Sequence, residues 1–418
     1  MNIKKIALII LFILVSIGLA FLIYTVFFKS PPPPVINNVP EQAGTLPSID
    51  EGGARIIDEQ ELEVPDLASS DFPKAKDVKI LEQAIAETAN GGLTYSEQVI
   101  SNRVSAGNFR ASNNQMLYYD SAQQSFYKLT AGGELTKLSN RKFYAVQNVT
   151  WSPTKNQGIL EYPDETKVLY DFDKDKQLAT LPKQMKDFSF SYNGNKLSSK
   201  WIGDYSDDNY VISSDPNGAN FKFVEPMGDK ADDVANVWSP DSEILATYRE
   251  QIDGIRQEIF FINEYGKNIH SLTVDGTGFE GVWNPSGKKL LYNVFSAKTD
   301  FNPVLWVATG KTDELGGGKR YIGLNTWVDK CSFSNTNDDL VYCAVPDYLP
   351  TGSGWYPEFA DELPYSIYKI NVSTGHKERV AEPVVNGTRV SIDQIFLNKG
   401  DEKIYYTDSN GYVYDLDL

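Results

Sequence analysis

The sequence predicts an all-β protein, a seven-bladed β-propeller made of four-stranded antiparallel blades. Two phrases that recur along the chain are the basis of this prediction. In the first phrase, an aromatic residue ends one apolar strand and a tight turn leads into the next strand. If weak copies are admitted, seven copies follow one another at intervals of 39 to 63 residues, and a six-bladed ring is the alternative count. The aromatic residues of the seven copies are Phe109, Trp151, Phe190, Trp238, Trp283, Phe333 and Phe396.

The turn in the first phrase has the composition of a tight hairpin. Residues 236–245 read NVWSPDSEIL, and residues 281–290 read GVWNPSGKKL. Asn or Ser at the first position, Pro at the second and Gly at the fourth suit a type I turn. Residues 284–287 satisfy all three preferences, and residues 239–242 lack only the Gly. We expect the aromatic residue to pack between neighbouring blades, beside the hairpin that the Pro turn fixes.

The second phrase lies between copies of the first and reads as strand, polar turn, strand. Its copies are expected at residues 126–138, 168–181, 259–272 and 367–380. Two hairpins in each repeat make a four-stranded antiparallel sheet, which is the blade of a propeller. A single blade cannot bury both of its faces, whereas blades in a ring bury each face against a neighbour.

The last repeat provides only three of its four strands, in EKIYYTDS and GYVYDLDL after Phe396. Propellers commonly complete the last blade with a strand from the N-terminal side. The stretch LTYSEQVI, from Leu93 to Ile100, is placed to do this. Such closure removes the exposed strand edge of the last blade.

The phrases that begin with Trp151, Trp238 and Trp283 resemble the WD40-like Pro-Asp repeats of TolB-type β-propellers. The resemblance covers about residues 100–418. No Trp in this chain is followed by Asp, as it is in true WD40 repeats. The resemblance implies a propeller fold, but the fold alone does not imply a function.

The N-terminal region predicts a membrane anchor. Residues 6–28 are 23 consecutive uncharged positions, which is long enough for a helix to cross a bilayer. Two lysines lie within residues 1–5, so the positive-inside rule places this end in the cytoplasm and the rest of the chain outside it. We expect a single-pass protein of the cell membrane with an extracytoplasmic propeller. A cleaved signal peptide is the alternative, although its apolar region is usually shorter and ends in a small-x-small site.

A disordered linker is expected over residues 29–76, followed by the propeller domain over residues 77–418. The linker contains four consecutive prolines and is otherwise acidic, spaced by prolines and poor in aromatic residues. Such a segment cannot bury enough apolar area to fold. We expect it to be a spacer between membrane and propeller. A short helix is expected from Val78 to Ala89.

The charge of the chain argues against nucleic acid as a partner. The formal net charge is −17, and the isoelectric point is near 4.7. Polyanions are repelled by such a protein.

A search for catalytic chemistry finds no candidate catalytic residue, metal site or cofactor. The G-x-S-x-G pattern of serine hydrolases is absent. The two histidines, His270 and His376, fall in or beside outer turns of different repeats. The sequence from Asp171 to Lys176 imitates the start of a calcium loop, but it lacks the Gly and Glu that such a loop needs at its sixth and twelfth positions.

Cys331 and Cys343 are the only cysteines and lie on the two arms of one predicted hairpin. At equal distance from the turn, they would face each other. We expect a disulfide outside the cytoplasm, with two buried free thiols as the alternative.

The longest interval between repeats contains an aromatic loop, VPDYLPTGSGWYPEFADELPY. Its candidate binding residues are Tyr348, Trp355, Tyr356 and Phe359, which belong to the types that dominate binding hot spots. We expect a membrane-tethered interaction or sensor module that contacts a protein or glycan here, with Trp355 as the anchor. Rings that cover their own blade are the alternative to a contact surface. The alternative function is a propeller lyase or hydrolase that uses carboxylates of the central channel.

Overall fold

The computed structural model describes residues 73–78, 85–104, 115–130, 133–265 and 269–418. These residues belong to the compact unit that runs from Val64 to Leu418. The predicted membrane anchor and nearly all of the predicted linker lie outside the described residues. Within the described ranges, no helix has the length and apolar character needed to cross a bilayer.

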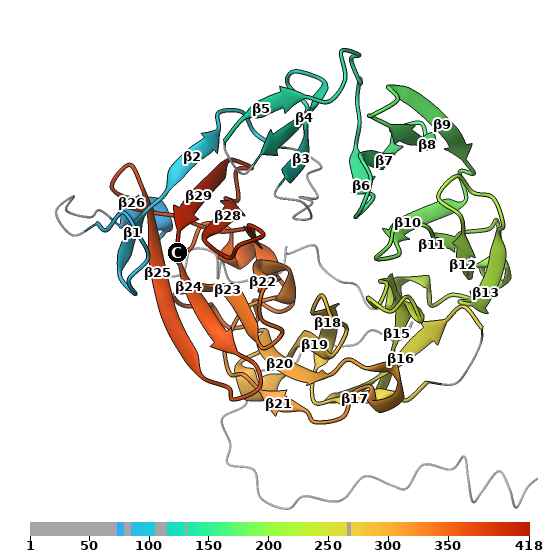
Figure 1. The fold of residues 1–418 in the computed structure, drawn as a ribbon. Coiled ribbons are helices and arrows are strands. Elements are labelled where there is room, and N and C mark those ends of the chain that lie inside the picture. Colours follow the sequence, from blue (N-terminus) through green and yellow to red (C-terminus); the bar gives the residue numbers. More distant parts are fainter. Residues whose placement is uncertain (1–72, 79–84, 105–114, 131–132, 266–268) are drawn as a thin grey trace, which may run out of the picture. The chain divides into compact units, whose positions relative to one another are not determined.

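The described residues form seven β-sheets that stand around a central axis as the blades of a propeller (Figure 1). We number the blades along the chain. Blade 1 contains β3 (Gln115–Asp120), β4 (Ser125–Thr130) and β5 (Leu135–Lys137). Blade 2 contains β6 (Asn148–Trp151), β7 (Gln157–Glu161), β8 (Lys167–Asp171) and β9 (Lys176–Leu181). Blade 3 contains β10 (Met185–Phe190), β11 (Leu197–Trp201), β12 (Tyr210–Ser214) and β13 (Lys222–Pro226). Blade 4 contains β14 (Val234–Asn236), β15 (Ile244–Asp253), β16 (Arg256–Asn263) and β17 (Leu272–Val274).

The remaining three blades complete the ring. Blade 5 contains β18 (Thr277–Trp283), β19 (Lys289–Phe295), β20 (Val304–Thr309) and β21 (Arg320–Tyr321). Blade 6 contains β22 (Cys331–Phe333), β23 (Leu340–Pro346), β24 (Tyr365–Asn371) and β25 (Lys377–Val385), with β1 (Leu93–Tyr95) and β26 (Thr388–Arg389) added to β25. Blade 7 contains β27 (Gln394–Leu397), β28 (Lys403–Thr407), β29 (Val413–Asp417) and β2 (Glu97–Ile100).

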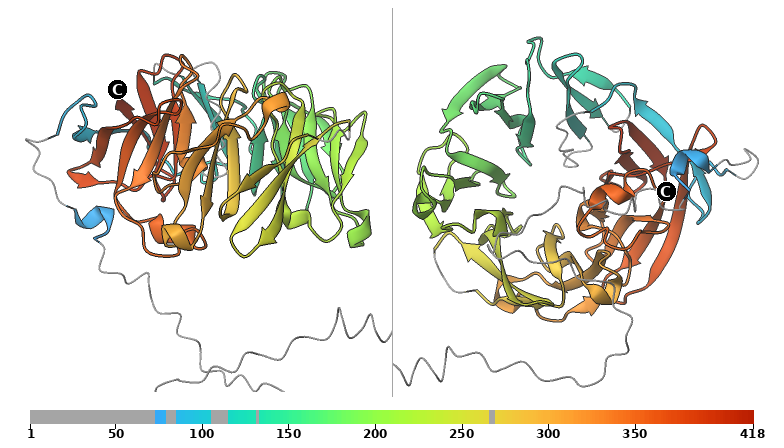
Figure 2. Two further views of the ribbon diagram at one scale, coloured as in Figure 1. Left: turned by 90° about the horizontal axis from the view of Figure 1, so that it is seen from below. Right: turned by 180° about the vertical axis from the view of Figure 1, so that it is seen from behind.

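Short 3-10 helices interrupt the segments outside the strands. They are η2 (Ala75–Asp77), η5 (Ser206–Asp208), η6 (Ala231–Asp233), η7 (Ala297–Thr299), η8 (Thr312–Glu314), η9 (Val328–Lys330) and η10 (Pro357–Ala360). Seen edge-on, the strands run between the two faces of the ring and the connecting loops gather on both faces (Figure 2). The structure therefore confirms the predicted all-β propeller of seven antiparallel blades.

The aromatic residue of the first phrase packs between blades, as the sequence predicts. The Trp151 ring, at the end of the innermost strand of blade 2, lies with its centroid 5.6 Å from that of Phe126 in blade 1. Trp238 of blade 4 donates a hydrogen bond from Nε1 to the Ser189 carbonyl of blade 3, over 3.0 Å. Phe333 of blade 6 belongs to one buried cluster with Leu305 and other residues of blade 5. Phe109, the first of the seven, lies outside the described residues.

The N-terminal stretch from Leu93 to Ile100 closes the ring, but it serves two blades instead of one. Its second half, β2, pairs antiparallel with β29, so that Glu97 faces Asp415 and completes blade 7. Its first half, β1, pairs parallel with β25, the outermost of the four core strands of blade 6. The prediction of closure by this stretch is thus confirmed.

The helix expected from Val78 to Ala89 is wrong over its described part. Residues 85–89 are not helical: Ala86 and Thr88 form isolated parallel bridges with Thr94 and Asp417, and Glu87 is a bend between them. The Ala89 amide donates to the Asp417 carbonyl over 2.9 Å. A helix would have to satisfy the same backbone groups internally, and here the neighbouring strands satisfy them instead.

The Pro turns have the predicted hairpin geometry. The Gly287 amide donates to the Asn284 carbonyl over 2.9 Å, and the Ser242 amide donates to the Ser239 carbonyl over 2.8 Å. The fourth turn residue is left-handed in both, with φ of 74° at Gly287 and 62° at Ser242. Gly adopts this conformation without a steric penalty, so the turn at Gly287 in blade 5 is unstrained. Ser242 in blade 4 has a Cβ atom and adopts the same conformation with some backbone strain.

These turns also connect neighbouring blades through polar contacts. Asp401, in the first turn of blade 7, accepts hydrogen bonds from Ser334 Oγ and Thr336 Oγ1 of blade 6, both over 2.6 Å. It also accepts one from the Asn335 amide over 3.0 Å. Between blades 2 and 3, Thr154 Oγ1 donates to the Asn193 carbonyl over 3.1 Å. The turn between the first two strands of a blade is therefore an inter-blade contact as well as a hairpin.

Replacing Asp401 by Ala should destabilise the protein, because the donors of the blade 6 turn lose their acceptor. The expected loss in free energy of unfolding is about 1–3 kcal/mol at pH 7, measured by urea denaturation. Burial alone would raise the Asp401 pKa, but the hydrogen bonds from Ser334 and Thr336 outweigh it and the pKa is lowered. This stabilisation is therefore present above the carboxyl pKa of the unfolded chain and is lost as the pH falls through the folded pKa. The exposed Asp229→Ala variant is the control, and an equal loss in it would contradict the assignment.

Candidate functional site

The predicted aromatic loop joins β23 to β24 of blade 6 and includes η10. It is fastened to the loop between β19 and β20 of blade 5. The Gly352 amide donates to the Asp300 carbonyl, and the Gly354 amide donates to the Phe301 carbonyl, each over 2.8 Å. A Cβ at Gly354 would lie 2.4 Å from Phe295 Cγ, so only Gly permits this close approach without displacement. The loop therefore has a defined position on its neighbouring blade.

The aromatic side chains of this loop are held by ring contacts but remain largely accessible. The Trp355 ring packs edge-on against Phe295 of blade 5, with centroids 4.7 Å apart, while 57% of the residue is exposed. Tyr356 is 51% exposed and stacks on Phe359, with centroids 5.3 Å apart. Phe301, on the blade 5 loop, is also partly exposed. We call Phe301, Trp355, Tyr356 and Phe359 the aromatic surface.

Tyr348 belongs to a different environment from the other three predicted residues. It is half-buried against the core cluster of blades 6 and 7, and its hydroxyl donates to the Pro73 carbonyl. The Ala75 amide donates to the Glu362 carbonyl over 2.7 Å, and Lys74 forms an ion pair with Glu362. The end of the predicted linker thus contacts the aromatic loop, and Tyr348 holds this contact.

One alternative from the sequence was that the rings of the aromatic loop cover their own blade. Trp355 instead packs against blade 5, across the blade boundary.

The sequence analysis did not identify Phe301 as part of this surface. Phe301 follows β19 in a different repeat from the aromatic loop. A signal existed in the printed sequence, since FSAKTDF has an aromatic residue at each end, but nothing local indicates that it meets residues 352–354.

A second candidate site lies near the axis of the ring. Glu280 is on β18, the innermost strand of blade 5, and Asp329 is in η9, just before the innermost strand of blade 6. Both residues are exposed to solvent. Their surroundings nevertheless resist ionisation: crowding by protein, followed by the charge of Asp329, raises the pKa of Glu280, while Arg249 opposes the shift. Water reaches the Glu280 carboxylate, but protein atoms surround much of it, so the side chain is accessible and its pKa is still raised.

Asp329 shares this electrostatic environment with a buried cation. Desolvation foremost raises the pKa of Asp329, Lys330 opposes the shift, and Asp393 adds to it. Lys330 is buried, and its Nζ donates to the carbonyls of Ile392 and Asp393 over 3.0 Å each. These groups come from strand β18 and from the connections that precede β22 and β27, which is why no sequence motif identifies them.

The histidines and the calcium-like turn are placed as the sequence led us to expect. His270 and His376 are exposed, between the third and fourth strands of blades 4 and 6. In the turn after β8, each aspartate accepts from a protein donor: Gln157 Nε2 to Asp171 over 2.8 Å, Asn156 Nδ2 to Asp173 over 2.7 Å, and Tyr170 Oη to Asp175 over 2.8 Å. Within the described ranges, no three His, Cys, Asp or Glu residues are grouped so as to hold a metal.

The two cysteines lie directly opposite each other. Cys331 on β22 pairs with Cys343 on β23, with Cα atoms 4.1 Å apart, and a disulfide joins them in the structure. The bond links the innermost two strands of blade 6, immediately after Lys330. The disulfide therefore restrains the part of blade 6 that follows Asp329 and Lys330.

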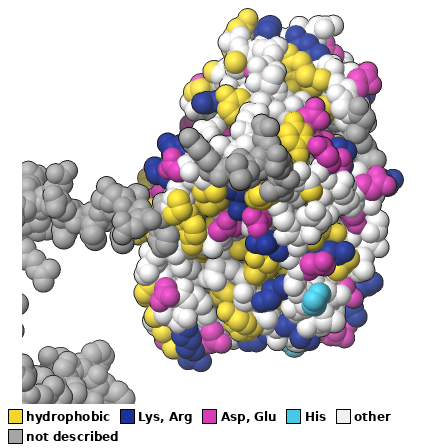
Figure 3. All heavy atoms as spheres, turned by 90° about the vertical axis from the view of Figure 1, so that its left-hand side faces the viewer, with side chains coloured by type: hydrophobic (Ala, Val, Ile, Leu, Met, Phe, Trp, Pro, Cys, Tyr) yellow, Lys and Arg dark blue, Asp and Glu magenta, His cyan; other side chains and the backbone are white. Residues whose placement is uncertain are grey.

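On the side of the ring that carries β1, β25 and β26, cationic and anionic side chains are interspersed and hydrophobic side chains are scattered (Figure 3). This face offers no continuous positive area for a polyanion.

Comparison with known proteins establishes the fold and goes no further. No protein-family model matches the chain, and no curated protein matches it. Among solved structures, the chain resembles the β-propeller domain of Cps50 (Swd1) from Myceliophteria thermophila, with a TM-score of 0.52 and 11% identity over 77% of this chain and 99% of that one. It also resembles an oligogalacturonate lyase in complex with manganese, with a TM-score of 0.46 and 14% identity over 76% and 89% of the two chains. The class is therefore that of seven-bladed β-propellers.

The raised pKa of Glu280 predicts that a Glu280→Gln variant is more stable than its parent at pH 7. The folded protein binds the carboxyl proton more tightly than the unfolded chain does, so ionised Glu280 lowers stability above the unfolded pKa. We expect the melting temperature at pH 7 to rise by about 1 °C or more, and the gain to vanish below about pH 4. The exposed Glu243→Gln variant is the matched control. A lower melting temperature at pH 7 for Glu280→Gln alone would show that the charge is stabilised instead.

Proposed function

We propose that this protein is a membrane-tethered, extracytoplasmic recognition module, a TolB-type propeller that contacts a protein or glycan partner through its aromatic surface. The observation that carries the proposal is the placement of Trp355 and Tyr356. Each is more than half exposed, yet each is held by a ring contact and by a fixed loop backbone.

Pre-ordered aromatic side chains favour binding because little conformational freedom is lost when a partner arrives. The two backbone hydrogen bonds from Gly352 and Gly354 fix the loop before any partner is present. Trp and Tyr also supply a large contact area for few rotatable bonds. This combination supports a contact surface more strongly than exposure alone would.

The charges beside the aromatic surface limit the chemistry of the partner. Glu358 and Asp361 lie on or next to η10 and are exposed. Burial foremost raises the pKa of Asp361, so a partner that desolvates this carboxylate further would favour its protonated form. Neutral sugar rings or a protein surface without strong negative charge fit this environment, whereas polyanions do not.

Membrane tethering is part of the proposal for two reasons: the composition of the N-terminal residues and the place where the predicted linker meets the propeller. The predicted anchor at residues 6–28 and linker at residues 29–76 precede the propeller. Lys74 and Ala75 contact Glu362 at the end of the aromatic loop. A tether attached there would hold the aromatic surface near the point where the linker enters, and the length of the linker would set its distance from the bilayer.

The membrane part of the proposal predicts that the full-length protein stays in the membrane fraction after washing with alkaline carbonate. External protease should release a propeller-sized fragment from intact cells or spheroplasts. A variant that lacks residues 6–28 is the control and should be recovered in the soluble fraction. Recovery of the parent as a soluble chain that begins shortly after the apolar segment would contradict the anchor and support a cleaved signal peptide.

The recognition part predicts that a Trp355→Ala, Tyr356→Ala double variant loses binding and keeps its fold. Affinity for partners identified on glycan and protein arrays should fall about tenfold or more, because such rings dominate contact energies. The melting temperature should change little, since both side chains are largely exposed. The matched control is a Tyr144→Ala, Tyr205→Ala double variant, which removes two exposed aromatic rings elsewhere on the ring. Undiminished binding by the Trp355, Tyr356 variant would overturn the proposal.

A second candidate function is a lyase or hydrolase that acts near the axis of the ring. The raised pKa values of Glu280 and Asp329 favour it, since a carboxyl group that retains its proton can serve as a general acid. If the partner is a glycan, the test is whether glycan recovered after incubation is intact or cleaved. Cleavage that Glu280→Gln abolishes while binding persists would favour the enzyme, and intact glycan would favour recognition alone.

A further inference from the structure

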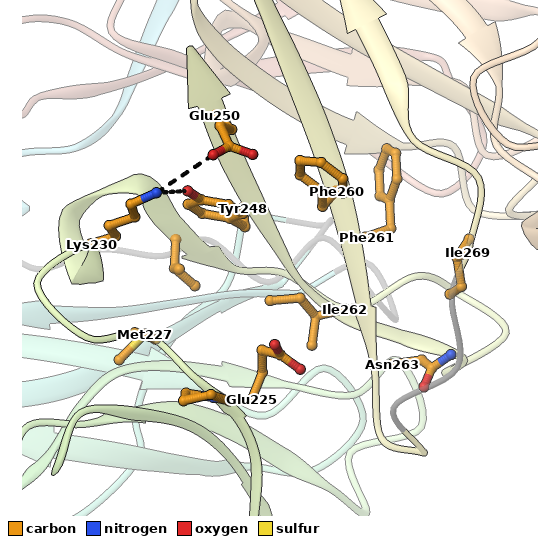
Figure 4. Close-up of a pocket in the computed structure, with 12 residues that line it drawn as sticks. Glu225, Met227, Lys230, Tyr248, Glu250, Phe260, Phe261, Ile262, Asn263 and Ile269 are labelled. Atoms are coloured by element: carbon orange, nitrogen blue, oxygen red, sulfur yellow. Dashed lines mark hydrogen bonds and ion pairs between the residues drawn. The ribbon is translucent and has the colours of Figure 1, made fainter. Parts of the chain in front are cut away.

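A pocket of about 370 Å³ opens between blades 3 and 4, away from the aromatic surface and the axial carboxylates. One wall comes from the end of β13 and the connection that follows it, including Met227 and Lys230. The other comes from β15 and β16 (Figure 4). Met227 and Val234, which line the pocket, belong to the hydrophobic cluster between these two blades.

One part of the pocket lining is apolar. Met227 and Val234 are buried there, and Phe260 and Ile262 are half-buried on the β16 wall. Tyr248 and Phe260 face each other across β15 and β16 and stack at 5.9 Å between centroids, with 21° between the ring planes. Such a surface favours a ligand with an apolar body.

The rim of the pocket already contains a cation-binding arrangement. Lys230 Nζ donates to Tyr248 Oη over 2.8 Å and lies 3.6 Å from a Glu250 carboxylate oxygen. It also lies 5.4 Å from the centroid of the Tyr248 ring. The two distances to Tyr248 place the ammonium beyond the hydroxyl and close to the ring plane, so the contact is a hydrogen bond to the phenol oxygen. A phenol oxygen and a carboxylate are both acceptors for the N–H groups of an ammonium. The hydrogen bond from Lys230 to Tyr248 is the foremost cause that raises the pKa of Lys230, so these neighbours favour a charged amine.

The cation in this arrangement is not firmly fixed. The Lys230 side chain is 51% exposed and comes from the connection between blades, next to η6. An exposed ion pair contributes little stability, so another cation can replace this one at low cost.

The charges around the pocket favour an amine over an acid. Glu225 and Glu250 contribute two negative charges and Lys230 contributes one positive charge. Figure 4 shows the Glu225 carboxylate near Ile262, apart from the Lys230 and Glu250 pair. A ligand carboxylate would meet Lys230 only beside Glu250, whereas a ligand ammonium in the place of Lys230 would lie beside Glu250 with no competing cation.

We propose that this pocket binds a small amine, a primary ammonium carried on an apolar body, whose cation takes the place of Lys230 beside Tyr248 and Glu250. The apolar body packs on Met227, Val234 and Ile262. Lys230 thus acts as an internal competitor for the site. This inference is independent of the proposed recognition function, since it uses other blades and other residues.

The test is a calorimetric titration of the full-length protein with two probes of one shape and opposite charge, 3-phenylpropylammonium and 3-phenylpropionate. The ammonium probe should bind the Lys230→Ala variant about three- to fivefold more tightly than the parent, because the competing cation is gone. It should bind Glu250→Gln more weakly than the parent by a similar factor. Lys137→Ala, which removes an exposed lysine of β5, should match the parent.

Three outcomes would overturn the proposal. The first is no binding of the ammonium probe to Lys230→Ala. The second is binding of the carboxylate probe that Lys230→Ala abolishes, which would make Lys230 an anion site. The third is equal affinity of the ammonium probe for all four proteins, which would place its site elsewhere. Melting temperatures of the variants, whose altered residues are exposed, verify that each is folded.

Discussion

The fold depends on one constraint: each blade is apolar on both faces and must be covered on both. Buried clusters cross the blade boundaries, as where Phe261 of blade 4 packs with Trp283 of blade 5. A row of such blades would leave two apolar faces in water, and the hydrophobic effect opposes this. Closing the row into a ring removes both exposed faces together, and the pairing of β2 with β29 completes the last blade. The inter-blade hydrogen bonds to Asp401 then fix the spacing at one of these boundaries.

Much of this architecture could be predicted from the sequence because its signals are local and repeated. The turn residues around Asn284 and Ser239 determine hairpins within four residues, and the aromatic residue before each turn marks an inter-blade position. Repetition made even weak copies informative. The helix expected from Val78 to Ala89 is wrong over residues 85–89, because Ala86 and Thr88 form bridges with strand residues of the propeller there.

The candidate sites were harder to predict because each is assembled across blades. The aromatic loop could be identified by composition, but its attachment to Asp300 and Phe301 depends on how two blades meet. Glu280 and Asp329 are 49 positions apart and belong to unrelated stretches of sequence. The contact of Lys230 with Tyr248 likewise joins a connection to a strand of the next blade. A single sequence contains no local signal for such contacts.

The closing strand has a consequence for the order in which the chain folds. β2 lies near residue 100, and its partner β29 ends at Asp417, so the pairing that completes the ring spans more than 300 residues. Contacts of such large sequence separation form late and slowly. During synthesis, β2 emerges long before β29 exists, while blades 1 to 6 can form in succession behind it. The nascent chain therefore carries an unpaired strand edge for most of its synthesis, and charged Glu97 on that edge discourages association with other chains.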